Sequence, residues 1–176
     1  MLTRKINAVI GLLATVSLLA HAISIAVWML SKGSVPRSME FMSRVLVVFV
    51  LIHVFISVDI IVSGIMSESG HKVKKYPKMN VSTVIQRVSG VLMVLFTGLH
   101  IAGAIGYMVP PRIVHGIVPP LFFLIALVHT SVSASKALIT LGIGSARFIK
   151  AADVAVKAIC LVTLICDVVG FYLYVW

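Results

Sequence analysis

The chain has 176 residues, of which 60% are hydrophobic and 11% charged, and its mean hydropathy is +1.14. This composition excludes an ordinary soluble domain and indicates a polytopic membrane protein. Five apolar segments are long enough to cross a hydrocarbon core of about 30 Å as helices, and none alternates in polarity like a barrel strand. We therefore expect a single all-α domain, a bundle of five transmembrane helices at about 6–30, 42–66, 82–108, 115–141 and 151–176.

The net charge of +10 is distributed unevenly between the two sides of the membrane. The amino end and the second and fourth loops hold most of the Lys and Arg residues, whereas the first and third loops hold few. The positive-inside rule therefore predicts a cytoplasmic amino terminus in a multi-pass protein of the cytoplasmic membrane. The basic face is expected to meet anionic lipid or a soluble protein, and not nucleic acid. The first segment follows Arg4 and Lys5 as a signal peptide would, but it is too long and lacks a cleavage site, so we expect a retained span.

The first two expected helices each hold one histidine within the apolar run. His21 lies past the midpoint of the first helix, towards the outside, and His53 lies near the middle of the second. Glu40 and Arg44 open the second helix, four residues apart on one face. Asp59 follows beyond His53.

The third and fourth helices also hold one embedded histidine each, His100 and His129, whereas the fifth has none. Gly142 and Gly144 are expected to end the fourth helix. The fifth opens with Asp153 and Lys157, an i,i+4 pair in the favourable order. Cys160 and Cys166 are six residues apart and thus on different faces, so they cannot pair with each other, and we expect buried thiols.

A weak internal repeat relates the first two helices to the third and fourth. Superposing His53 on His129 places Ser57 on Ser133, and aligning the first helix with the third leaves His21 and His100 one turn apart. The simplest interpretation is a duplicated two-helix unit. Chance similarity between apolar helices is the alternative.

One embedded histidine on each of four helices favours a ligand set over four separate structural donors, because imidazole is costly in hydrocarbon and needs a reason to be there. The obvious ligand is haem b, whose usual axial ligand is neutral imidazole. Pairing by depth joins His21 with His100 for an outer haem and His53 with His129 for an inner one. Two axial histidines leave no coordination site for oxygen or substrate, so such haems carry electrons.

Three further polar residues are candidates for the same chemistry. Lys136 is seven residues after His129 and on the same face, where it could meet a haem propionate; snorkelling to the interface or pairing with Asp59 are the alternatives. Thr83 and Arg87 share a face at the inner membrane edge and could hydrogen-bond a quinone carbonyl or a propionate. Arg87 could instead be an interfacial anchor.

The run Ser-Thr-Val-Ile-Gln-Arg-Val-Ser-Gly over 82–90 resembles the Ser-x-x-x-Arg-x-Ser-Gly opening of the large membrane-anchor subunit of succinate dehydrogenase. His129, with Ser133 four residues on, Lys136 seven on and Gly142 thirteen on, is similar to the haem-binding helix of that subunit. Five helices and four histidines further resemble the di-haem cytochrome b anchors of succinate:quinone oxidoreductases, which include quinol:fumarate reductases. The sequence departs from them in placing its histidine-free helix last and in having Gln86 where a histidine is familiar.

The resemblance implies a proximal haem b on His53 and His129, a distal haem b on His21 and His100, and a quinone site, for menaquinone or ubiquinone, at Thr83 and Arg87. It also implies partners on the cytoplasmic face, an iron-sulfur subunit and a flavoprotein subunit. Glu40, at the outer edge, could accept a proton from quinol, although a solvated carboxylate at a helix start is the simpler interpretation.

The chain has no dinucleotide fingerprint and no cysteine cluster, so we expect a non-catalytic electron-transfer subunit that cannot oxidise succinate by itself. Two alternatives stay open. One is a di-haem anchor of another dehydrogenase, although such anchors typically place two ligands on one helix. The other is a haem-free transporter or scaffold whose histidines relay protons.

Overall fold

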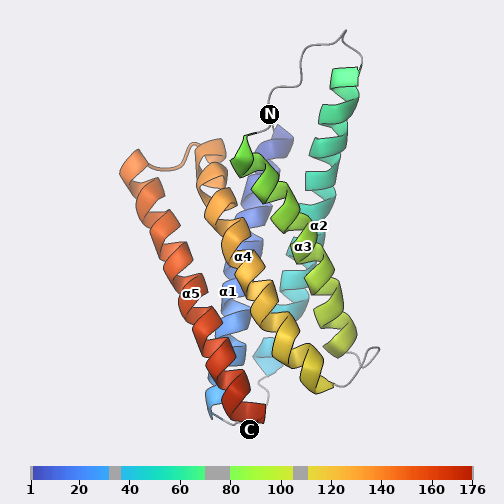
Figure 1. Ribbon diagram of the computed structural model, residues 1–176. Helices are drawn as coiled ribbons and strands as arrows, with labels where there is room; N and C mark the ends of the chain where they lie inside the picture. Colours follow the sequence, from blue (N-terminus) through green and yellow to red (C-terminus); the bar gives the residue numbers. More distant parts are fainter. Residues whose placement is uncertain (1, 32–36, 70–79, 105–110, 176) are drawn as a thin grey trace.

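The computed structural model describes residues 2–31, 37–69, 80–104 and 111–175 (Figure 1), and over these residues it contains helices and no strand. The expected all-α fold is therefore confirmed. Residues 105–108 of the third expected helix, the lysines of the second loop and Trp176 lie outside the described residues. The five helices are α1 (Leu2–Ser31), α2 (Arg37–Ser69), α3 (Val81–Ala104), α4 (Pro111–Leu141) and α5 (Ala146–Val175).

Four of these helices are long and apolar enough to cross a membrane, which indicates a membrane protein. The spans are Leu2–Trp28 in α1, Met39–Gly64 in α2, Val81–Gly103 in α3 and Pro120–Leu141 in α4. The crossing by α5 stays a prediction: this helix has 30 residues, but its first half carries Arg147, Lys150 and the Asp153–Lys157 pair.

Helices α1 and α4 lie at the centre of the described bundle. Helix α1 packs against α2, α4 and α5, and α4 packs against α3, α1 and α5. Figure 1 shows α2 and α3 on one side of this central pair and α5 on the other. Among helices α1 to α4, we call α1 with α3 and α2 with α4 the diagonal pairs; over the described residues neither pair is in contact, and α2 and α3 are not in contact either.

The buried core of the described bundle combines alanines with Leu18 and Phe123, whereas many large apolar side chains face outwards. Ala22 is completely buried on α1, and Ala126 is buried on α4, whereas Phe55 and Val91 are more than 70% exposed. Small residues let membrane helices approach closely, and lipid solvates the large ones. This inside-out distribution supports a lipid environment around the described helices.

Local signals fix the helix ends that the structure describes. The side chain of Asn80 accepts a hydrogen bond from the Ser82 backbone N–H at 3.2 Å and so caps the start of α3. Gly142 and Gly144 have φ angles of 71° and 85°, a conformation that side chains disfavour, so glycine ends α4 there as expected.

Helix α5 carries two aspartates in contrasting surroundings. Asp153 accepts hydrogen bonds from Lys157 Nζ at 2.5 Å and from the Ser135 hydroxyl of α4 at 3.2 Å. Asp167 is only 4% exposed, and neither carboxyl oxygen has a hydrogen-bond partner among the described residues. Sequence reasoning identified the first aspartate and missed the second.

We predict opposite changes in the thermal unfolding temperature when each of the two aspartates is replaced by alanine. Asp167→Ala should raise the thermal unfolding temperature in detergent, because a buried polar group without a partner costs about 1–3 kcal/mol. Asp153→Ala should lower it, because Lys157 and Ser135 lose their acceptor. Loss of stability in Asp167→Ala would mean that its carboxyl has a partner in the membrane.

Candidate functional site

His53 on α2 packs its ring against the backbone of Gly11 on α1. A Cβ atom at position 11 would lie 2.9 Å from His53 Cε1, closer than real Cβ atoms approach, and 3.1 Å from Nδ1. Nδ1 itself is buried and lacks a partner with hydrogen-bond geometry among the described residues. A residue larger than glycine at position 11 would therefore require the ring to shift.

The ring of His129 on α4 packs in a similar way against the backbone of Gly90 on α3. A Cβ atom at Gly90 would lie 3.3 Å from His129 Cε1, and the backbone of Gln86 faces the ring. Unlike His53, His129 has a side-chain partner: its Nδ1 lies 3.0 Å from the hydroxyl oxygen of the buried Ser89.

The Ser89 hydroxyl joins His129 to the backbone of α3. Its oxygen lies 2.6 Å from the Ile85 carbonyl oxygen, 3.2 Å from the Gln86 carbonyl oxygen and 3.0 Å from His129 Nδ1. When the hydroxyl donates to a backbone carbonyl, His129 Nδ1 donates to the hydroxyl oxygen and Nε2 holds the lone pair. A ligating histidine takes that form, with one ring nitrogen bound to the metal and the other donating to a neighbouring group.

His53 and His129 lie on helices that do not pack against each other in the described bundle, α2 and α4. Helices α1 and α3 are likewise not in contact over the described residues, and neither are α2 and α3. A haem held by both histidines would need α2 and α4 to stay apart, because the macrocycle would separate them.

His21 and His100 are placed on the other diagonal, on α1 and α3, and both are half-buried. Nδ1 of His21 is buried without a hydrogen-bond partner among the described residues. The glycines that contact the rings of His53 and His129 show how α1 and α3 correspond. Gly11 and Gly90 are 79 residues apart, and so are His21 and His100. The two histidines thus lie ten residues, or about 15 Å, beyond their respective glycines.

Two polar contacts join the same helix pairs at a level next to the histidines. Asn7 Nδ2 donates to the Ser57 hydroxyl at 3.1 Å between α1 and α2. Lys136 Nζ donates to Gln86 Oε1 at 3.1 Å between α4 and α3. Lys136 thus has Gln86, and not the expected alternative Asp59, as the partner the structure describes; Asp59 interacts with Ser63 on its own helix. Asn7 and Gln86 are again 79 residues apart.

The expected quinone and proton residues lie towards the ends of their helices. Thr83 is half-buried in the first turn of α3, and its backbone N–H donates to the Asn80 carbonyl at 2.7 Å. Arg87 is exposed and lines a shallow apolar depression of about 280 Å³ with Val88, Val91 and Leu92. Glu40 pairs with Arg44 at 2.8 Å, with 66% of its side chain exposed, and such exposed pairs contribute little to stability.

No group of three or more His, Cys, Asp or Glu side chains gathers in the described part of the chain. A haem would need only two protein donors, and histidine is one of its usual axial ligands. Cys160 and Cys166 are both free thiols, and Cys160 lies 3.9 Å from the Thr130 hydroxyl.

Sequence reasoning found the histidines but missed the residues that contact their rings. Gly11, Asn7 and Ser89 each lie in an apolar helix with no chemical motif of their own. The available signal was spacing, since a register of 79 residues aligns Asn7 with Gln86, Gly11 with Gly90 and His21 with His100.

Comparison of the chain with protein-family models, with curated proteins and with solved structures finds no match. The interpretation of this site therefore depends on its own geometry.

Gly11→Ala should displace the His53 ring, because the new methyl group would overlap Cε1. We expect a destabilisation of about 1–3 kcal/mol, typical of overpacking, measured by thermal unfolding in detergent. Gly98→Ala is the matched control, since a Cβ there meets nothing within 4 Å and alanine favours a helix. Equal losses of stability in Gly11→Ala and Gly98→Ala would contradict the proposed packing of His53 against Gly11.

Ser89→Ala should weaken ligand binding at His129, because it removes the acceptor that fixes the ring. Loss of such a partner typically costs about 10–100-fold in metal affinity, which a haem titration followed by absorbance would measure. Ser133→Ala is the control, since its hydroxyl donates to the His129 backbone carbonyl and not to the ring. Unchanged haem affinity in Ser89→Ala would show that this hydrogen bond does not prepare a ligand.

Proposed function

We propose that this chain is the haem b membrane-anchor subunit of a succinate:quinone oxidoreductase, a succinate dehydrogenase or a fumarate reductase. In this role it transfers electrons between an iron-sulfur subunit and a membrane quinone. The proposal includes five membrane crossings, with α5 as the last, and a cytoplasmic amino terminus. The flavoprotein and iron-sulfur subunits dock on the basic cytoplasmic face.

The observation that carries the proposal is the state of His129. His129 Nδ1 lies 3.0 Å from the Ser89 hydroxyl, a contact that engages one ring nitrogen and leaves Nε2 for a metal. A second embedded histidine, His53, lies on α2. Two histidines on different helices of an apolar bundle would supply the two imidazole ligands of a haem b.

Each residue of the site then has a defined task. His53 and His129 hold a proximal haem b, and His21 and His100 hold a distal one; when bound, each haem supplies a one-electron carrier. Gly11 and Gly90 let the proximal rings lie against the neighbouring helices. Lys136, positioned by Gln86, offers a cation for a propionate.

A second candidate function is favoured by one observation, the buried and unpartnered carboxyl of Asp167. Ionisable groups within membrane helices commonly belong to proton pathways, so a haem-free transporter whose histidines relay protons would also use such a group. That function predicts a colourless protein. The contact between His129 Nδ1 and the Ser89 hydroxyl supports the haem proposal instead, because a ligating histidine makes such a contact with its second ring nitrogen.

The proposal is tested by a reduced-minus-oxidised spectrum and pyridine haemochrome quantitation of the purified chain, repeated for His21→Ala and His129→Ala. We expect two haems b per chain and the loss of one in each variant. One haem that is insensitive to His21→Ala would make His21 and His100 structural. A well-folded protein without haem would refute the electron-transfer function, and two haems without a succinate dehydrogenase partner would favour the anchor of another dehydrogenase.

A further inference from the structure

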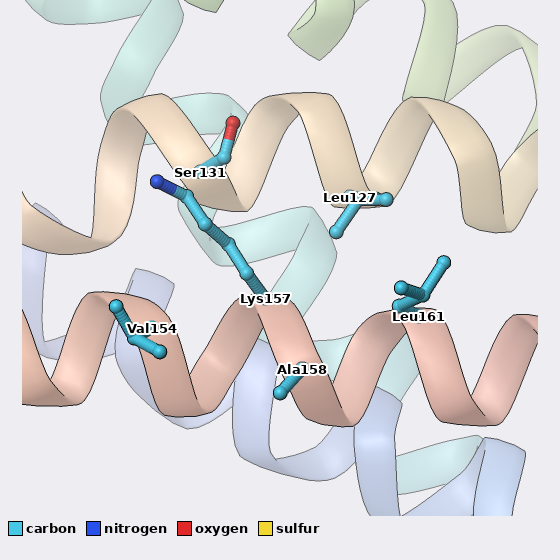
Figure 2. Close-up of a pocket in the computed structure, with 6 residues that line it drawn as sticks. All are labelled: Leu127, Ser131, Val154, Lys157, Ala158 and Leu161. Atoms are coloured by element: carbon cyan, nitrogen blue, oxygen red, sulfur yellow. The ribbon is translucent and has the colours of Figure 1, made fainter.

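A groove between α4 and α5 lies on the opposite face of α4 from His129. Figure 2 shows its lining, with Leu127 and Ser131 from α4 and Val154, Lys157, Ala158 and Leu161 from α5. Its volume is about 500 Å³, and it is open along its outer side. The walls are apolar except for the Ser131 hydroxyl and the Lys157 ammonium, which extends from α5 towards α4 (Figure 2).

The groove lies beside the middle of the α4 span. Ser131 is 11 residues after Pro120 and 10 before Leu141, the ends of the α4 span, and is thus about 15 Å from each. Lys157 is placed at a similar depth by the contacts on either side of it, since Cys160 meets Thr130 and Asp153 meets Ser135. Phospholipid headgroups lie at the ends of such a span, not at its middle.

The polar groups of the groove suit a neutral ligand. Lys157 is paired with Asp153 at 2.5 Å, so the two charges cancel, yet its side chain is 42% exposed. The ammonium has three N–H donors, of which the contact with Asp153 uses one. A neutral pair with spare donors attracts a hydrogen-bond acceptor without net charge, and not a phosphate anion.

We infer that this groove binds the head ring of a membrane quinone, with Lys157 donating a hydrogen bond to one ring carbonyl. Quinones are neutral, carry carbonyl acceptors and dissolve in the hydrocarbon core, so they meet both conditions of depth and charge. The inference rests on the proposed function for its ligand class. It places a quinone site on α4 and α5, separate from the depression beside Arg87 on α3.

The test is photolabelling of the full chain in lipid nanodiscs with an azido-substituted benzoquinone that carries a short isoprenoid tail, followed by peptide mapping. We expect labels within 127–135 and 154–161, and we expect decylubiquinone to compete for them. Labels confined to the region around Arg87, or labels displaced by excess phosphatidylglycerol and not by decylubiquinone, would overturn the site.

Two variants test the groove without depending on a single substitution. Ala158→Phe should abolish the competed labelling by filling the groove, whereas Ile159→Phe, on the opposite face of α5, should preserve it. Lys157→Met combined with Asp153→Asn removes the donor and leaves no unpaired carboxylate, and should reduce labelling about tenfold, the equivalent of one hydrogen bond. Unchanged labelling in both groove variants would refute the inference.

Haem content measured on the same samples separates this inference from the proposed function, because labelling requires no haem. Competed labelling in a haem-free protein would support the quinone site and refute the electron-transfer anchor. Two haems without labelling in the groove would support the electron-transfer anchor and refute the quinone site.

Discussion

The structure depends on one constraint, that polar groups within the membrane must find their partners inside the protein. Many of the described hydroxyls meet it within their own helix, by donating to a carbonyl one turn earlier, and a smaller set of side chains meets it between helices that pack directly. Ser89 meets His129 between α3 and α4, Asn7 meets Ser57 between α1 and α2, and Ser135 meets Asp153 between α4 and α5. Each bond both satisfies a costly group and fixes the register of two helices.

Small residues make these contacts possible. Glycine at positions 11 and 90 lets an imidazole ring lie directly against the backbone of a neighbouring helix, and buried alanines bring α1, α4 and α5 together. In the part of the chain that the structure describes, helices α2 and α3 are not in contact, and neither are α1 and α3 or α2 and α4. The bundle is thus closely packed along α1 and α4, and each proposed pair of haem ligands lies on two helices that do not touch over the described residues.

Helix α4 connects the two proposed activities, because its faces carry different chemistry. One face presents His129 and Lys136 to α3, and the other presents Ser131 to the groove with α5. A haem ligand and a quinone donor on opposite sides of one helix are separated by about one helix diameter, ~10 Å. Helix α5, which holds no histidine, then supplies the lysine and aspartate of the second face.

The sequence by itself determined the helical class, four of the spans, the glycine end of α4 and the position of one histidine in each of four helices, because apolar runs and punctuating residues act locally. It could not identify Gly11 or Ser89 as the seats of the two rings, or choose Gln86 over Asp59 as the partner of Lys136. It also gave no sign that Asp167 is buried. These features depend on which helix faces meet, and apolar helices of similar composition can pack in many registers until specific polar and small residues select one.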